Sequence, residues 1–159
     1  MEPKKKLEDY GIHHVGYVVK DLDETVNHFK KFYGIDDFQI YEFSPSKVWS
    51  YGEEVQQYRL KIAMGKLKNT TCGIEIIQPL EGEGVHKDFI VDGNNGMHHI
   101  CFAVEDYDYW REHFMNAKAE FVFESETEDE INGYRRCFYA EDLKTEMIFE
   151  IKEIPHFRK

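Results

Sequence analysis

Cysteine is scarce in this chain, and long apolar runs are missing. The 159 residues include three cysteines, Cys72, Cys101 and Cys137, which lie far apart and form no C-x-x-C pattern. An odd number of scattered cysteines argues against a disulfide framework and is typical of thiols that stay reduced in a cytoplasm. We therefore expect a cytoplasmic protein.

Membrane and nucleic-acid partners are excluded on similar grounds. No apolar run reaches the roughly 18 to 20 residues of a membrane helix, and the N-terminal MEPKKKLEDY lacks the apolar region of a secretory signal. The chain has 20 Lys and Arg against 31 Asp and Glu, a net charge of −11, whereas nucleic acid requires a basic face. We expect a small-molecule partner and a homodimer.

The most informative feature present is an internal repeat. Residues 13–24 read HHVGYVVKDLDE and residues 98–109 read HHICFAVEDYDY, so that two histidines, a valine and two aspartates recur at a constant offset of 85 residues. In each copy an alternating strand opens with the histidine pair and runs into a helix. Such self-similarity predicts two copies of one supersecondary unit.

Three further strands follow the helix in each copy, which predicts an α+β fold of two tandem β-α-β-β-β modules. Module one spans about residues 11–80, the Gly- and charge-rich connector about 81–95, and module two about 96–153. No linker typical of independent domains separates the modules, so we expect residues 1–159 to form a single domain.

The segment from Tyr41 to Tyr58 is the longest departure from this plan. It contains Phe43, Trp49 and Tyr51 without a period that would bury all three in a core. We expect a strand at each end of the wider region from Phe38 to Leu60 with a loop between them, and we expect Tyr41 to Tyr58 to form part of a pocket wall or a lid. Packing against a dimer partner is the alternative.

Each module carries one histidine and one glutamate at matching places. His14 and His99 open equivalent strands, while Glu75 and Glu150 lie within strands between apolar residues. A glutamate in such a strand is unfavourable unless it is exposed, paired or bound to a metal. Any of the four taken alone is more often an ordinary surface or core residue, but their duplication predicts a metal site.

The other six of the eight histidines are expected to lie outside this site. By strand alternation, His13 and His98 point to the opposite face, where we expect a structural role. The rest lie on predicted helix surfaces, in the connector or in the tail and are expected to be inert: His28, His113, His86 and His156.

Taken together, these segments resemble the vicinal oxygen chelate superfamily, which includes glyoxalase I, bleomycin and fosfomycin resistance proteins, extradiol dioxygenases and methylmalonyl-CoA epimerase. The nearest matches, to the epimerase and to glyoxalase I-like proteins, are HHVGYVVKDLDET, GIEIIQPLEGEG and GMHHICFAVED. The similarity covers about residues 11–153. It implies a curved mixed sheet around a metal-binding cavity, in which one divalent ion (Ni, Co, Zn or Mn, or Fe in a dioxygenase) is bound by His14, Glu75, His99 and Glu150.

The resemblance also implies an enzyme. The expected activity is that of a metal-dependent epimerase, isomerase or lyase, acting through an enolate on a 2-substituted acyl-CoA, as in methylmalonyl-CoA epimerase, or on a hemithioacetal, as in lactoylglutathione lyase. Glu150 is expected as the catalytic base, with Glu54 as a second acid or base. Carboxylates at both Glu75 and Glu150 favour this reaction over a ferrous ring-cleavage dioxygenase, whose iron takes two histidines and one carboxylate. A bleomycin-resistance-type binding protein is the third alternative.

Overall fold

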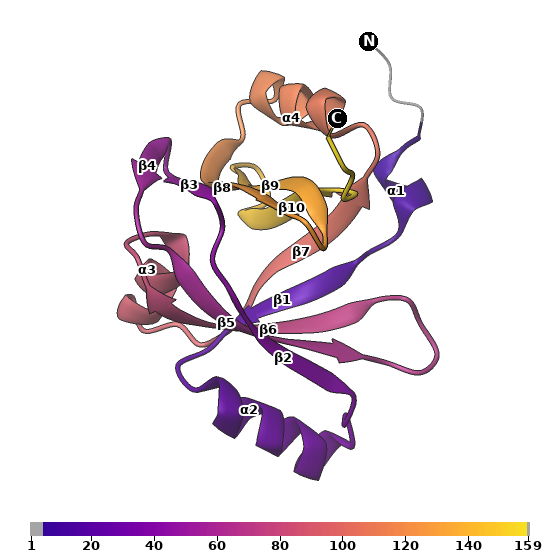
Figure 1. The fold of residues 1–159 in the computed structure, drawn as a ribbon, viewed down its shortest axis with the longest axis vertical. Helices are drawn as coiled ribbons and strands as arrows, with labels where there is room; N and C mark the ends of the chain where they lie inside the picture. The colour runs from indigo at the N-terminus through magenta and orange to yellow at the C-terminus, as the bar shows by residue number, and fades with distance from the viewer. Residues whose placement is uncertain (1–4, 159) are drawn as a thin grey trace.

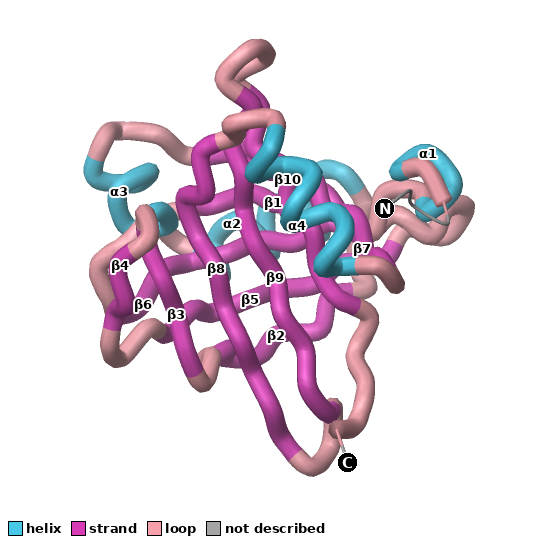
Figure 2. The backbone as a smooth tube through the Cα atoms, turned by 90° about the horizontal axis from the view of Figure 1, so that it is seen from above, coloured by secondary structure: helices cyan, strands magenta, loops and turns pink. Residues whose placement is uncertain are grey.

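The computed structural model describes residues 5–158 and builds them around one strongly curved sheet (Figures 1 and 2). The sheet has ten strands in the order β2-β5-β6-β1-β7-β10-β9-β8-β3-β4. The strands are β1 His14–Val18, β2 Phe38–Phe43, β3 Lys47–Ser50, β4 Glu53–Val55, β5 Arg59–Lys66, β6 Gly73–Glu81, β7 Gly96–Val104, β8 Glu120–Asp129, β9 Gly133–Asp142 and β10 Met147–Glu153. The helices are α1 Leu7–Tyr10, α2 Leu22–His28, η1 Phe29–Tyr33, α3 Val85–Val91 and α4 Tyr107–Asn116.

The predicted duplication is confirmed by the pairing of the strands. Module one has the order β2-β5-β6-β1 and module two the mirrored order β8-β9-β10-β7, and the modules meet where β1 pairs with β7. This pairing is antiparallel and reciprocal, because His14 lies opposite Cys101 and Gly16 lies opposite His99. The expected α+β fold, with its curved mixed sheet, is therefore confirmed.

One helix covers the outer face of each module (Figure 1). On module one, Leu22 and Val26 of α2 pack against Ala63 and Ile76 of the sheet. On module two, the equivalent packing joins Tyr107 and Trp110 of α4 to three sheet residues, namely Phe138, Ala140 and Ile151. The alternation of strand side chains then leaves the residues between these positions for the inner face.

The helix of module one begins after a capping aspartate. Asp21 caps α2 by accepting a hydrogen bond from the backbone N–H of Glu24. After His28 the helix continues as one π-helical stretch, η1, and ends at Gly34, whose φ of 71° suits glycine.

The segment 41–58 is not the loop that its irregular pattern predicts. It forms the end of β2 and all of β3 and β4, and β3 pairs with β8 of module two. Only residues 44–46 join β2 to β3, and three residues span at most about 14 Å. The sheet therefore has to curl until β2 and β3 approach each other. In Figure 2, β8 and β9 run crosswise to β2 and β5, as this curling requires.

The connector also contains structure that the sequence analysis does not predict. Residues 85–91 form α3, which buries Val85 and His86 against the inner face of the sheet. In the part of the chain that the structure describes, no helix has the length and apolar character needed to cross a bilayer.

Candidate metal centre

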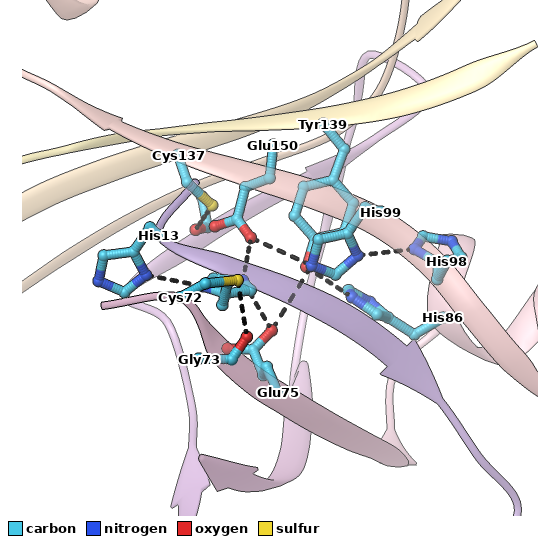
Figure 3. A network of polar contacts seen from close by, with 12 residues as sticks. His13, Cys72, Gly73, Glu75, His86, His98, His99, Cys137, Tyr139 and Glu150 are labelled. Carbon is cyan, nitrogen blue, oxygen red and sulfur yellow. Dashed lines mark hydrogen bonds and ion pairs between the residues drawn. The ribbon is translucent and has the colours of Figure 1, made fainter. Parts of the chain in front are cut away.

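Four buried side chains converge where the two modules meet. They come from β1, β6, β7 and β10, and one nitrogen or oxygen atom of each lies within 4.8 Å of the corresponding atom of the others: His14, Glu75, His99 and Glu150. His14 Nε2 lies 3.1 Å from Glu150 Oε1 and 3.3 Å from Glu75 Oε1. His99 Nε2 lies 3.2 and 3.5 Å from the same two oxygens. Figure 3 shows the two carboxylates pointing toward each other with the His99 ring beside them.

The same strand register positions each glutamate. Glu75 on β6 lies opposite Gly16, and Glu150 on β10 lies opposite Cys101. Gly16 and Cys101 are equivalent, since each follows the histidine of its module by two residues. In both modules the carboxylate is therefore displaced from its histidine by the same step along the strand.

Gly16 has a steric role that its module-two equivalent does not share. A Cβ atom at this position would overlap Nε2 and Cε1 of His99. The absence of a side chain on β1 thus gives the His99 ring the room to reach the cluster.

The four groups are charged when they pair with one another. Burial lowers the pKa of His14, but Glu75, the Cys101 thiol and Glu150 outweigh it and hold that pKa above its usual value. Burial also lowers the pKa of His99, but the two carboxylates outweigh it and raise that pKa. Burial raises the pKa of Glu75, whereas His14 and His99 lower it to about 2, and the pKa of Glu150 falls well below its usual range for the same reason. Without a metal, the carboxylates thus favour protonated imidazoles, and the imidazoles favour ionised carboxylates.

The cluster fits a divalent ion in geometry as well as in donor chemistry. Ligands about 2.1 Å from a tetrahedral ion are separated by about 3.4 Å, close to the nitrogen–oxygen distances observed. His99 Nε2 is buried without a hydrogen-bond partner of adequate geometry among the described residues. With both imidazoles deprotonated, the two carboxylates would balance a charge of +2, so these four residues could hold one such ion.

A second histidine touches each candidate ligand. His13 Nδ1 lies 2.8 Å from His14 Nδ1, and His98 Nδ1 lies 2.9 Å from His99 Nδ1. His13 is an exposed residue whose ring is partly covered, and this partial desolvation lowers its pKa to about 4, whereas burial lowers the pKa of His98 to about 2. Both rings are therefore neutral and can accept a hydrogen bond from the Nδ1–H of the neighbouring ring, which leaves the Nε2 of that ring free for a metal.

Strand alternation gave the wrong direction for His13 and His98. On β7 the partner of Gly16 is His99 while the partner of Tyr17 is Met97, so His98 is the extra residue of a β-bulge. A bulge allows consecutive side chains to serve the same region of a sheet. His13 precedes the first residue of β1 and is not bound by the alternation.

His86, which lies in the connector, is buried and hydrogen-bonded in the structure. Its Nδ1 lies 2.6 Å from the Tyr58 hydroxyl. Its Nε2 lies 3.1 Å from the Tyr139 hydroxyl (Figure 3). Burial lowers the pKa of His86 to about 3, so the ring is neutral. The Tyr139 ring in turn packs on His99, with 4.5 Å between centroids. Sequence reasoning missed this support because the flanking Gly-rich residues gave no helical pattern.

Glu54 does not reach this region. It is exposed on β4, at the edge of the sheet, and it does not line the cavity beside the cluster. No local sequence pattern fixes the position of Glu54, because β3, the strand before it, pairs with β8 of module two. The cavity carboxylates of the described chain are Glu75 and Glu150.

The cavity has a volume of about 510 Å³ and unlike walls. The wall from module one is largely apolar: Ile40, Phe43, Leu60, Ile62 and Ile77. The wall from module two is largely polar or cationic: Ser125, Thr127, Asn132, Arg135, Cys137 and Lys152. Sequence reasoning missed Lys152, although it follows Glu150 by two residues and so shares its face of an alternating strand. Tyr41 and Phe43 also line the cavity, so part of the segment 41–58 forms the expected pocket wall.

Solved structures with the same fold include methylmalonyl-CoA epimerase from Mycobacterium tuberculosis, with 18% sequence identity, a TM-score of 0.63, and coverage of 92% of this chain and 88% of that chain. A variant of the Streptomyces coelicolor methylmalonyl-CoA epimerase in complex with 2-nitronate-propionyl-CoA has 20% identity, a TM-score of 0.63, and coverage of 94% and 97%. A variant of 4-hydroxymandelate synthase from Streptomyces coelicolor has 11% identity, a TM-score of 0.60, and coverage of 94% of this chain and 50% of that chain.

At these identities the three likenesses establish the fold alone. No curated protein sequence matches the chain significantly. A family model does match, over residues 13–138, which include the histidine strands of both modules. The chain belongs to the glyoxalase/bleomycin resistance protein/dioxygenase superfamily.

Proposed function

We propose that this protein is a metal-dependent epimerase or isomerase that acts through an enolate on a 2-substituted acyl-CoA or on a hemithioacetal. The observation that carries the proposal is the presence of both carboxylates, Glu75 and Glu150, within the cluster of four donor groups. A ferrous oxygenase needs a face with open positions, left by two histidines and one carboxylate. Two histidines and two carboxylates leave less room on the ion and suit a reaction without oxidation.

A bound divalent ion would supply positive charge to a carbonyl oxygen and so stabilise the enolate that forms there. His14 and His99 would be held in the required tautomer by His13 and His98. Glu150 lines the cavity and is ionised at neutral pH, so it can accept a proton from the carbon next to that carbonyl.

The second proton-transfer group follows from the same geometry. Epimerisation needs a group on each face of the enolate, whereas isomerisation can use one. Because Glu54 lies on an edge strand, Glu75 is the remaining described carboxylate of the cavity. In an epimerase, Glu75 of module one would therefore serve the face opposite Glu150.

The test measures two quantities. NMR follows the exchange of the substrate α-hydrogen with solvent deuterium, and oxygen consumption is recorded in the same reaction. Methylmalonyl-CoA is the first substrate and the hemithioacetal of methylglyoxal with a thiol is the second. We expect exchange without oxygen uptake, and we expect Glu150→Gln to abolish it, because the amide cannot accept the proton while its shape preserves the fold.

Glu54→Gln is the matched control, since the same chemical change on exposed β4 should leave the exchange rate unaltered. Metal content is measured in both variants, so that loss of the ion is separated from loss of the base. Oxygen consumption with either substrate would overturn the enolate mechanism.

A further inference from the structure

The cationic residues of the cavity all come from module two. Arg135, Arg136 and Lys152 line it, whereas module one contributes no Lys or Arg among the described residues. This gathering is unexpected in a chain whose net charge is −11. The question is which of the three charges is available to a ligand.

Arg136 is already satisfied. Its Nε and Nη2 atoms donate to Glu153 at 2.9 and 2.7 Å, and its Nη1 donates to Asp108 at 3.0 Å. The guanidinium also stacks over the Tyr107 ring, 4.4 Å from its centroid. Arg136 therefore fixes α4 to the outer face of the sheet.

Arg135 is engaged at one of its nitrogen atoms. Its Nη1 donates to Asp129 at 3.0 Å and to the carbonyl of Gly133 at 3.1 Å. Within the described chain, its Nε and Nη2 atoms make no protein hydrogen bond. Arg135 can thus donate to a ligand while Asp129 offsets most of its charge.

Lys152 is the cation without a partner. It is half-buried on β10, and no ion pair or hydrogen bond of its ammonium group is found among residues 5–158. It follows Glu150 on the same face, so the two Cα atoms lie roughly 6 to 7 Å apart. The equivalent residue of module one is Ile77.

A divalent ion would balance Glu75 and Glu150 and would leave the charge of Lys152 uncompensated. A partly buried ammonium without a counter-ion is unfavourable, and a ligand anion at this place would remove that penalty. One free ammonium beside a half-engaged guanidinium suits a monoanion better than a phosphate dianion. The apolar wall opposite, which includes Ile62 and Ile77, suits a hydrocarbon substituent.

We infer that the substrate carries a carboxylate a few bonds from its reacting carbon, and that this carboxylate pairs with Lys152 and Arg135 while an apolar substituent packs on the module-one wall. The inference rests on the proposed function for the position of the reacting carbon. Lys152 is then the residue that determines specificity for a substrate with a carboxylate.

The test measures binding of methylmalonate to the metal-loaded protein by isothermal titration calorimetry. The uncharged methylmalonamide and inorganic phosphate are titrated in parallel. Because a hydrogen bond between charged groups is lost, Lys152→Met should weaken methylmalonate binding by at least about tenfold, and Lys152→Arg should restore most of it. Binding of the diamide should be the same in all variants.

Lys61→Met is the matched control, because Lys61 pairs with Asp23 on the outer face and does not line the cavity. It should change methylmalonate binding less than twofold. Thermal unfolding and metal content establish that Lys152→Met is folded and loaded. The inference is overturned if Lys152→Met binds methylmalonate like the wild type, or if phosphate binds more tightly than methylmalonate in a manner that depends on Lys152.

The two proposals fail in different ways. If methylmalonate binding depends on Lys152 but neither candidate substrate exchanges its α-hydrogen, the carboxylate site stands and the enolate function fails. If methylmalonyl-CoA exchanges its α-hydrogen with unchanged KM in Lys152→Met, the enolate function stands and the role of Lys152 is overturned.

Discussion

Module one holds His14 and Glu75 in the same register as module two holds His99 and Glu150, yet the walls around these residues have little in common. Two residues after the glutamate, on the same face of the strand, module one has Ile77 and module two has Lys152. A candidate metal site at the junction of two copies constrains only the four donor residues and the strand register. The walls can diverge without disturbing the donors, and this difference gives the cavity an apolar side and a cationic side.

The modules also support their histidines differently. His98 is buried, 8% exposed, beneath α3, and it contacts His86, Phe89 and Tyr139 through its ring. His13 is exposed at the start of β1. The same polar contact is therefore rigidly held in module two and open to solvent in module one.

The largest expected effect tests whether the two modules contribute equally to metal binding. His14→Ala and His99→Ala should each lower the affinity for a divalent ion by about 100-fold or more, because four ligands share a total of about 10–16 kcal/mol. Competition titration against a chelating indicator measures both. His28→Ala on the surface of α2 is the control. A variant of either histidine that binds like the wild type would show that this histidine is not a ligand.

The next largest expected effect on metal affinity arises from the steric difference between Gly16 and Cys101. Gly16→Ala should lower metal affinity by about 100-fold, comparable to loss of a ligand, because the new methyl group would occupy the place of the His99 ring. Cys101→Ala at the equivalent position removes a buried thiol and should retain the metal, at a cost of about 1 kcal/mol in stability. Metal content and thermal unfolding of the two variants provide the comparison. Equal metal content in both would contradict the steric role of Gly16.

The constellation of donors could be predicted from the sequence because each part of it is local. The repeat places a histidine at the start of a strand, and an isolated glutamate between apolar residues marks the strand that pairs with it. The side-chain period of two then fixes which residues share a face, so Lys152 could have been found in the same way from Glu150.

The curling of the sheet, the position of Glu54 and the burial of His86 could not be predicted, because they depend on contacts between distant parts of the chain. The pairing of β3 with β8 arises only when the sheet curls, and no local pattern around Trp49 records it. The position of Glu54 followed from the same unpredicted pairing. His86 lies in a short helix between glycine-rich turns, where seven residues give too little periodicity to reveal a buried face.

The pH dependence of metal binding sharpens the comparison further. Carboxylates raise the pKa of both His14 and His99 when no ion is present, which favours the protonated form of both imidazoles. A metal ligand must lose its proton, so affinity should fall as the pH falls, by about tenfold per pH unit for each proton released. Titrations at three pH values, together with a pH-stat, count the protons. Two protons per ion would mean that the modules are equivalent, and one would mean that they differ.

The smallest expected effect concerns the histidines that contact the ligands. His98→Gln should lower metal affinity by about tenfold, the lower end of the range for partners of metal ligands, because His99 loses the acceptor that fixes its tautomer. His13→Gln should have a weaker effect, since exposed His13 can be replaced by water at the Nδ1 of His14. The same chelator competition measures both variants, with His156→Gln in the tail as the control.

The contrast between these two variants separates tautomer control from packing. If His98 acted only by filling space beneath α3, His98→Phe would keep the affinity that His98→Gln loses. If it acts by accepting the proton of His99, the phenyl ring would fail as the amide does, because neither presents an acceptor where the imidazole Nδ1 lies. Equal and unchanged affinities for His98→Gln and His13→Gln would contradict the role of the duplicated histidine pair. In that case the recurrence of His13 and His98 at the offset of 85 residues would be explained by packing alone.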